Sequence, residues 1–175
     1  MGLGDYFSHY PVLAAAVART KGPVLELGCG YGSTYMLHYM CAERFLVTAD
    51  TNLDWLHKFS EGYACPRKHE FIHVDKWEEF SFLEATKWSV AFVDNQPGEM
   101  RTPLIRRLKG RTTFIVAHDS ERDYDTGANY KYEEVIPLFK YVSEWKRVRP
   151  YTLILSDEQP FPIEPCDTKW NPKDP

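Results

Sequence analysis

Short apolar runs alternate with longer mixed segments along most of the chain. Several of the runs are rich in Val, Ile or Phe and contain few polar residues, which is typical of strands covered on both faces of a parallel sheet. The predicted strands are Val24–Leu27, Phe45–Ala49, Glu70–Val74, Val90–Val93, Thr113–Ala117 and Thr152–Leu155. This alternation favours an α/β fold built around a parallel sheet.

The mixed segments between these strands predict helices. We expect them over Pro11–Arg19, Ser33–Cys41, Asn52–Ser60, Trp77–Thr86, Pro103–Lys109 and Tyr130–Phe139. The span Tyr141–Pro150 indicates a short strand that pairs antiparallel with the last one. Prolines recur from position 160 to the end of the sequence and exclude a helix there. We therefore expect a single domain over residues 1–157 and a proline-rich tail over residues 158–175.

The segment Val24–Thr34 indicates a buried strand, a glycine-rich turn and the start of a helix. The three glycines of the turn are Gly28, Gly30 and Gly32. Glycine permits positive φ and close approach of a ligand to the main chain, and the helix that follows offers free N–H groups to an anionic ligand group. Glu26 precedes the turn, and Ser33 stands where a dinucleotide-binding motif has its third glycine. A carboxylate repels a pyrophosphate and suits a cation, so the turn fits S-adenosylmethionine better than NAD. The alternative is a tight turn that binds nothing.

Acidic residues follow most of the predicted strands, at the sheet edge where α/β proteins bind ligands. They are Glu26, Asp50, Asp75, Asp94 and the pair His118-Asp119. Asp50 follows the glycine turn at about the spacing at which an acid reaches ribose hydroxyls, and Asp75 is placed to accept a hydrogen bond from an adenine amino group. The alternative for both is a helix cap.

Net charge, apolar stretches and cysteine spacing indicate which kinds of partner and which compartment to expect. A formal net charge of −4 argues against a nucleic-acid-binding protein, which needs a basic face, so we expect a small-molecule partner. The apolar stretch Val12–Ala18 is too short to span a membrane, and we expect no membrane association. The four cysteines form no C-x-x-C pair, which predicts free thiols and a cytoplasmic protein.

The motif Glu26–Gly32, followed in order by Asp50, Asp75 and Asp94, resembles the class I S-adenosylmethionine-dependent methyltransferases over about residues 9–156. The resemblance implies a Rossmann-like, seven-stranded sheet, mostly parallel with the last strand antiparallel, and helices on both faces. It also assigns residues to the cofactor: Glu26, Gly28, Gly30, Gly32, Asp50 and Asp75.

Two further segments, Phe92–Asp94 and Val116–Asp119, are similar to the small-molecule O-methyltransferases in which acids after the fourth and fifth strands hold a divalent ion. His118 stands where an acid is usual in that group. Asp94, His118 and Asp119 are therefore both the candidate catalytic residues and the candidate metal ligands.

Methyl transfer to a hydroxyl requires alignment of the reactants and removal of a proton. His118, with an unperturbed pKa of about 6.5, is the candidate base. In the alternative, the three residues hold a divalent ion that lowers the pKa of the acceptor, and one imidazole among carboxylates favours Mn, Fe, Co or Zn over Mg.

The expected function is transfer of a methyl group from S-adenosylmethionine to a small-molecule hydroxyl. Two alternatives stay open: a different S-adenosylmethionine-dependent reaction, and a non-catalytic cofactor-binding or interaction protein. The cluster at residues 94, 118 and 119 discriminates between an enzyme and a binder, because a binder has no need to assemble it.

Overall fold

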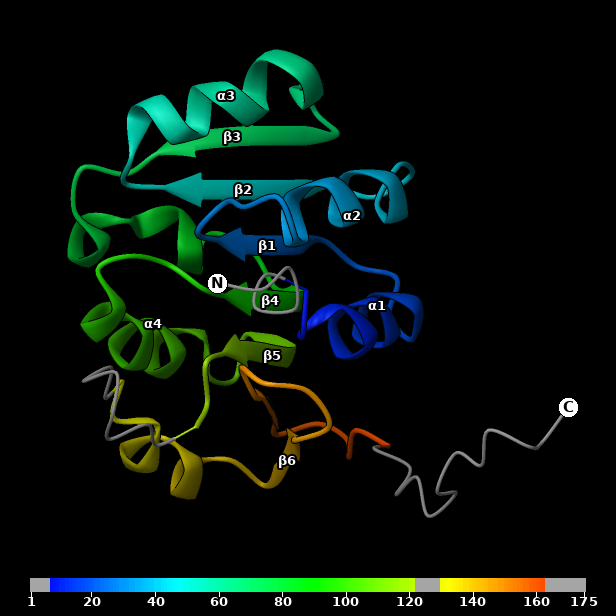
Figure 1. Ribbon diagram of the computed structural model, residues 1–175, viewed down its shortest axis with the longest axis vertical. Helices are drawn as coiled ribbons and strands as arrows, with labels where there is room; N and C mark the ends of the chain where they lie inside the picture. The colour runs from blue at the N-terminus through cyan, green and yellow to red at the C-terminus, as the bar shows by residue number, and fades with distance from the viewer. Residues whose placement is uncertain (1–6, 122–129, 163–175) are drawn as a thin grey trace, which may run out of the picture.

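The computed structural model describes residues 7–121 and 130–162, and a seven-stranded sheet runs through them in the order β3-β2-β1-β4-β5-β7-β6 (Figure 1). Five neighbouring strands are parallel: β1 (Val24–Leu27), β2 (Leu46–Asp50), β3 (His69–His73), β4 (Trp88–Val93) and β5 (Thr112–His118). The strand β7 (Thr152–Ser156) is antiparallel to both β5 and β6 (Tyr141–Trp145). The expected α/β fold class is therefore confirmed, including the antiparallel pair at one edge.

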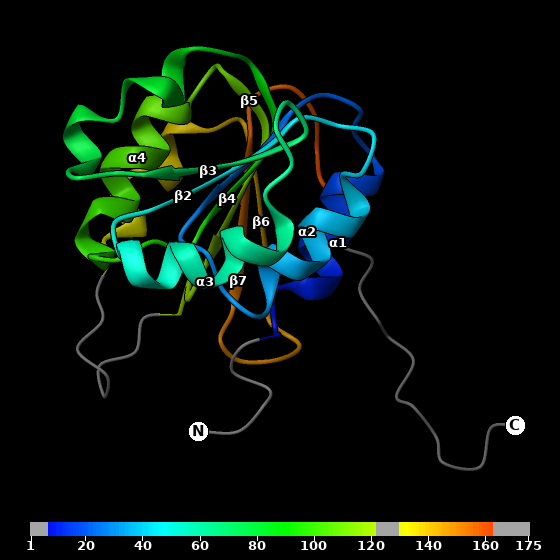
Figure 2. The same cartoon turned by 90° about the horizontal axis from the view of Figure 1, so that it is seen from above.

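Helices cover both faces of the sheet (Figure 2). They are α1 (Tyr10–Ala18), α2 (Ser33–Met40), α3 (Leu53–Tyr63) and α4 (Arg101–Leu108). One apolar core lies between the sheet and α4, and a second lies between the sheet and the α1 and α2 side. All six residues of β4 are buried because both of its faces are covered.

Two of the predicted helices are wrong, because those segments form 3₁₀ turns. Residues 77–86 contain the turns Trp77–Glu79 and Ser81–Glu84. The apolar side chains of Trp77, Phe80 and Leu83 are all buried, and their spacing of three residues matches the three residues per turn of a 3₁₀ helix.

The second wrong helix covers residues 130–139, which contain the turns Tyr132–Glu134 and Ile136–Leu138. Lys131 has a φ of +56°, which prevents a helix from beginning at Tyr130. Pro137 lacks an N–H group and excludes an α-helix that continues through it.

Two expectations from composition, free thiols and no membrane-spanning segment, can be compared with the described residues. Cys29, Cys41 and Cys65 are free thiols, and the fourth cysteine lies outside the described residues, as does most of the proline-rich tail. Within residues 7–121 and 130–162, no helix has both the length and the apolar character needed to cross a membrane.

Candidate functional site

The carboxyl ends of the parallel strands meet at one edge of the sheet, at the left in Figure 1. Two groups of the predicted residues lie there. The first is the glycine turn after β1, together with the end of β2. The second is formed by the residues that close β4 and β5.

Gly28 has a φ of +92°, and a Cβ atom at this position would lie 2.5 Å from the main-chain oxygen of Asp94. Only glycine allows the turn to pass this close to the end of β4. A Cβ on Gly30 would have no neighbour within 4 Å, so the space above the middle of the turn is open to a ligand. Of the three glycines, only Gly28 uses the positive φ that glycine permits; Gly32 is the N-cap residue of α2 with a φ of −69°.

Asp50 ties the glycine turn to the end of β2. Its Oδ2 accepts a hydrogen bond of 2.9 Å from the main-chain N–H of Cys29, and its Oδ1 accepts one of 2.8 Å from Asn52 N–H. Asn52, not Asp50, caps α3 by accepting from Trp55 N–H. The helix-cap alternative for Asp50 is therefore wrong.

Asp75 stands apart from this group. Its side chain is 91% exposed, and its carboxylate lies 3.7 Å from Nδ1 of His73. Its role toward an adenine ring stays a prediction.

Glu26 is fully buried beneath the turn. Its carboxylate accepts hydrogen bonds from the hydroxyls of Thr34, at 3.0 and 3.1 Å, and of Thr48, at 2.6 Å. Burial raises the pKa of Glu26 to about 7, against the opposing effect of these hydroxyls and that of Ser33. Since Thr34 also accepts a bond from Gly30 N–H, Glu26 is connected to the turn through a threonine rather than through an exposed carboxylate.

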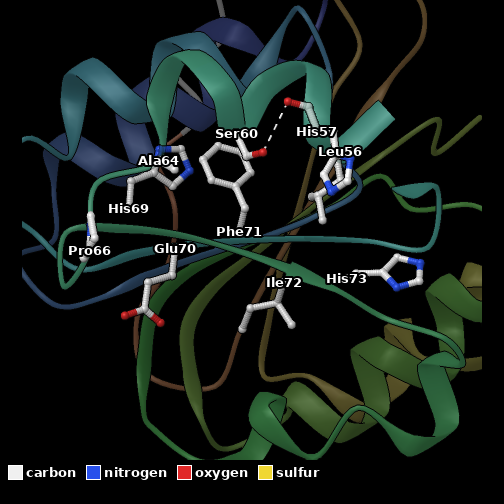
Figure 3. Close-up of a pocket in the computed structure, with 10 residues that line it drawn as sticks. All are labelled: Leu56, His57, Ser60, Ala64, Pro66, His69, Glu70, Phe71, Ile72 and His73. Carbon is white, nitrogen blue, oxygen red and sulfur yellow. Dashed lines mark hydrogen bonds between the residues drawn. The ribbon is translucent and has the colours of Figure 1, made fainter. Parts of the chain in front are cut away.

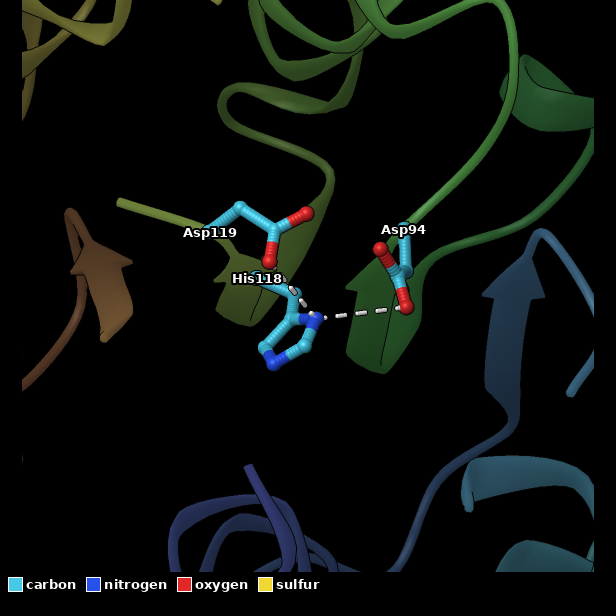
Figure 4. Close-up of side chains that lie close together, drawn as sticks. All are labelled: Asp94, His118 and Asp119. Atoms are coloured by element: carbon cyan, nitrogen blue, oxygen red, sulfur yellow. Dashed lines mark ion pairs between the residues drawn. The ribbon is translucent and has the colours of Figure 1, made fainter. Parts of the chain in front are cut away.

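Asp94, His118 and Asp119 lie together, as the sequence predicts (Figure 4). Nδ1 of the buried His118 lies 3.4 Å from Oδ2 of Asp94 and 3.3 Å from Oδ1 of Asp119. Its other nitrogen, Nε2, lies 2.9 Å from the hydroxyl of Ser8. Asp119 has a φ of +55°, a conformation that Asp tolerates better than most residues, and it points its carboxylate back to the imidazole.

Arg101 completes the cluster. Its guanidinium is buried at the start of α4, with one nitrogen 2.7 Å from Oδ1 of Asp94 and another 2.9 Å from Oδ2 of Asp119. A third bond of 3.1 Å reaches the main-chain oxygen of His118. The sequence shows an arginine shortly after Asp94, but nothing in the local pattern reveals that its partners are Asp94 and Asp119.

The charges of this cluster favour a protonated imidazole. Burial opposes the imidazolium, but the hydrogen bond and charge of Asp94, with the charge of Asp119, outweigh burial and raise the pKa of His118. For Asp94, burial opposes the charged form, but Arg101 and His118 hold the pKa of the carboxyl below its usual value.

The same contacts weigh against a metal ion among these side chains. Each carboxylate offers one oxygen to Arg101 and the other to His118. A divalent ion would have to displace the guanidinium or sit beside it, and like charges at this distance repel. The donor set therefore does not fit a divalent ion while Arg101 keeps its place.

His9 covers the other side of the imidazole. Its ring centroid lies 4.8 Å from that of His118 and 4.6 Å from that of Phe92, and the side chain is 2% exposed. Burial, and then the proximity of His118, lower the pKa of His9 to about 3, so the ring is neutral. Among residues 7–121 and 130–162, neither ring nitrogen of His9 has a hydrogen-bond partner, which is unusual for a buried polar group and indicates a place for a ligand.

Comparison with known proteins shows which solved structures share this fold. No protein-family model matches the chain, and no curated protein matches its sequence. Human methyltransferase-like protein 13 in complex with SAH has a similar structure, with a TM-score of 0.65, 14% identity, and coverage of 89% of this chain and 85% of that one. An rRNA methylase from Streptococcus thermophilus matches with a TM-score of 0.61, 16% identity, and coverage of 86% and 96%. The Methanococcus jannaschii fibrillarin pre-rRNA processing protein matches with a TM-score of 0.62, 14% identity, and coverage of 88% and 78%. At these identities the likeness shows the fold, and the chain has the Rossmann-like fold of the class I S-adenosylmethionine-dependent methyltransferases.

Proposed function

We propose that this protein transfers a methyl group from S-adenosylmethionine to a hydroxyl oxygen of a small-molecule acceptor. The observation that carries the proposal is the contact between the two halves of the site. The glycine turn passes so close to Asp94 that only glycine fits at position 28, and Asp94 in turn holds the imidazole of His118. A ligand on the turn and a base at His118 thus share one edge of the sheet.

The cofactor half consists of the turn and the loops after β2 and β4. The space over Gly30 is open, the Asp50 carboxylate lies against the turn, Glu26 lies beneath it, and Asp75 is assigned to the adenine side. We assign the nucleoside part to the shallow, open groove that follows Asp50 in the chain and is lined by Thr51, Asn52, Leu53, Asp54, Gln96 and Pro97. S-adenosylmethionine supplies the methyl group on a sulfonium whose positive charge disperses during transfer.

The acceptor half is centred on Nε2 of His118. The hydroxyl of Ser8 lies 2.9 Å from this nitrogen, so a substrate hydroxyl that takes the place of Ser8 is within reach for proton transfer. His118 accepts the proton at Nε2, while the carboxylates at Nδ1 stabilise the imidazolium that forms. Arg101 orients both carboxylates, and its charge lowers the pKa of Asp94. His9 offers one donor and one acceptor to a second polar group of the acceptor.

A small acceptor is supported by the net charge of −4 and by the burial of Ser8 and His9 against the cluster. RNA is the competing acceptor, since two of the similar structures are an rRNA methylase and a pre-rRNA processing protein. The free thiols of the described cysteines favour a reducing compartment such as the cytoplasm.

Calorimetry followed by a product screen tests the proposal. The protein is expected to bind S-adenosylmethionine and its demethylated product and not NAD. Asp50→Ala is expected to weaken binding by about 1.5–3 kcal/mol through the loss of charge-assisted hydrogen bonds. Incubation with methyl-labelled S-adenosylmethionine should then label a component of a small-molecule extract. Label in total RNA alone would assign the acceptor to RNA, and label in neither would favour a non-catalytic binder.

A further inference from the structure

A continuous chain of hydrogen bonds leads from Glu26 on β1, through Thr48 on β2 and His69 on β3, to His38 on α2. The hydroxyl of Thr48 lies 2.6 Å from Oε2 of Glu26 and 2.9 Å from Nε2 of His69. Nδ1 of His69 lies 3.0 Å from Nδ1 of His38. Glu26, Thr48 and His69 are buried, whereas His38, on α2, is half-buried.

The outer end of this chain, His38, is half-buried on α2. His69 lines a pocket between α3 and the edge strand β3, on the same side of the strand as Phe71 (Figure 3). His57 and His73 line the same pocket. The inner end lies under the glycine turn, because Glu26 also accepts from Thr34, whose hydroxyl accepts from Gly30 N–H.

The hydrogens of this chain have two consistent arrangements. With Glu26 ionised, Thr48 donates to Glu26, His69 donates to Thr48 through Nε2–H, and His38 donates to His69 through Nδ1–H. With Glu26 protonated, every bond reverses: Glu26 donates to Thr48, Thr48 donates to Nε2 of His69, and His69 donates to His38 through Nδ1–H. All three bonds are satisfied in both arrangements.

We propose that Glu26, Thr48, His69 and His38 form a proton relay that couples the charge of Glu26 to cofactor binding. A proton that enters at Nε2 of His38 displaces the Nδ1 proton of His38 onto His69. The Nε2 proton of His69 moves to Thr48, and the hydroxyl proton of Thr48 moves to Glu26. One proton enters and one is gained by the carboxylate, so the step balances without any other reactant. A cation bound at the glycine turn favours ionised Glu26 and drives the proton out along the same path. This coupling rests on the proposed function, but the relay itself does not.

Of the two buried ionisable groups of the relay, Glu26 and not His69 titrates near neutrality. Its pKa of about 7 reflects burial first, and the charge of Asp50 adds to the effect. Burial and the neighbouring His38 lower the pKa of His69 to about 3, so His69 stays neutral and carries the proton only in transit. The other ionisable groups that interact with Glu26 are Tyr10, Cys29 and Cys41, and Tyr39 and Tyr63 contact the ring of His38. Burial raises the pKa values of Tyr10, Cys29 and Cys41, so these three stay neutral across the relevant range.

Nitrogen-15 NMR of the histidine rings tests the relay in the full chain without cofactor. As the pH falls from about 8.5 to about 5.5, His69 is expected to change from the Nε2–H to the Nδ1–H tautomer, with a midpoint near the pKa of Glu26. Glu26→Gln and Thr48→Val should each leave His69 in a single tautomer at every pH. Thr34→Val is the matched control: it removes the other threonine bonded to Glu26 but leaves the relay whole, so the tautomer change should persist with a higher midpoint. A single tautomer at all pH values in the unmodified protein, or a tautomer change that survives Thr48→Val, would overturn the relay.

Addition of S-adenosylmethionine at about pH 6.5 tests the coupling. It is expected to return His69 to the Nε2–H tautomer, whereas adenosine, which carries no cationic group, should leave the mixture unchanged. If calorimetry shows that S-adenosylmethionine binds and the tautomers do not respond, the coupling is wrong and the proposed function stands. If S-adenosylmethionine does not bind, the proposed function fails, and the result without cofactor still decides the relay.

Discussion

The hydroxyl of Ser8 lies 2.9 Å from Nε2 of His118, on the side of the imidazole away from Asp94 and Asp119. The base nitrogen therefore already faces a hydroxyl, and both groups are buried. A substrate hydroxyl must displace Ser8 to reach the same position. Removal of this internal competitor by Ser8→Ala is expected to keep activity and to lower the KM of the acceptor identified by the product screen.

Replacement of the base separates catalysis from binding. His118→Gln is expected to reduce the rate of methyl transfer by roughly 10²–10⁴-fold, the usual contribution of a general base. The affinity for the demethylated cofactor, measured by calorimetry, should change little because His118 lies on the acceptor half of the site. Full activity in this variant would contradict the assignment of His118.

The rate should rise with pH. His118 accepts a proton only in its neutral form, and its pKa is raised by Asp94 and Asp119 against the effect of burial. The rate is therefore expected to be low below this pKa and to increase to a plateau above it, with a midpoint above the ordinary value of about 6.5. Asp119→Asn removes one of the charges that raise the pKa, so the midpoint of the pH–rate profile should move to lower pH. An unchanged midpoint would show that another group controls the profile.

Arg101 is expected to stabilise the fold through the two carboxylates that it bridges. Arg101→Met removes a buried cation and leaves Asp94 and Asp119 without their partner. Loss of one partner of a buried ion pair costs about 3–5 kcal/mol, and the lower end applies because both carboxylates are partly exposed. Urea unfolding measures the change, and Arg107→Met, which breaks an ion pair with the less buried Glu84, is the control with a smaller expected loss.

We expect His9 to lower the stability of the fold and to contribute to binding of the acceptor. His9→Phe removes two buried nitrogens that have no partner in the described part of the chain and keeps a ring against Phe92, so the free energy of unfolding is expected to rise by about 1 kcal/mol. The KM of the acceptor is expected to rise in the same variant, because the neutral donor and acceptor of His9 are lost. A rise in stability with unchanged KM would make His9 a core residue without a role in binding.

A chelator should leave methyl transfer unchanged. Arg101 and His118 already occupy the carboxylate oxygens that a divalent ion would need. Activity measured in excess EDTA is therefore expected to equal activity without it. Loss of activity that Mn or Zn restores would support the metal alternative and would require Arg101 to leave the cluster.

The sequence alone was sufficient for the strands and for much of the site. Apolar runs such as Val90–Val93 predict buried strands because a strand covered on both faces needs apolar residues at every position. The meeting of Asp94 with His118 and Asp119 follows from the same inference, since the carboxyl ends of neighbouring parallel strands share one edge. The need for glycine at position 28 also belongs to the local motif.

Tertiary structure alone decided which charges and rings surround these residues. Arg101 and Arg106 lie on the same helix and differ only in the face they present, so only packing against the sheet buries the first beside two carboxylates. The burial of a neutral His9 and the hydrogen-bond chain from Glu26 to His38 depend on contacts between segments far apart in the chain. Periodicity and spacing report the face that a residue turns to the core, whereas the partner it finds there is set by how helices and strands pack together.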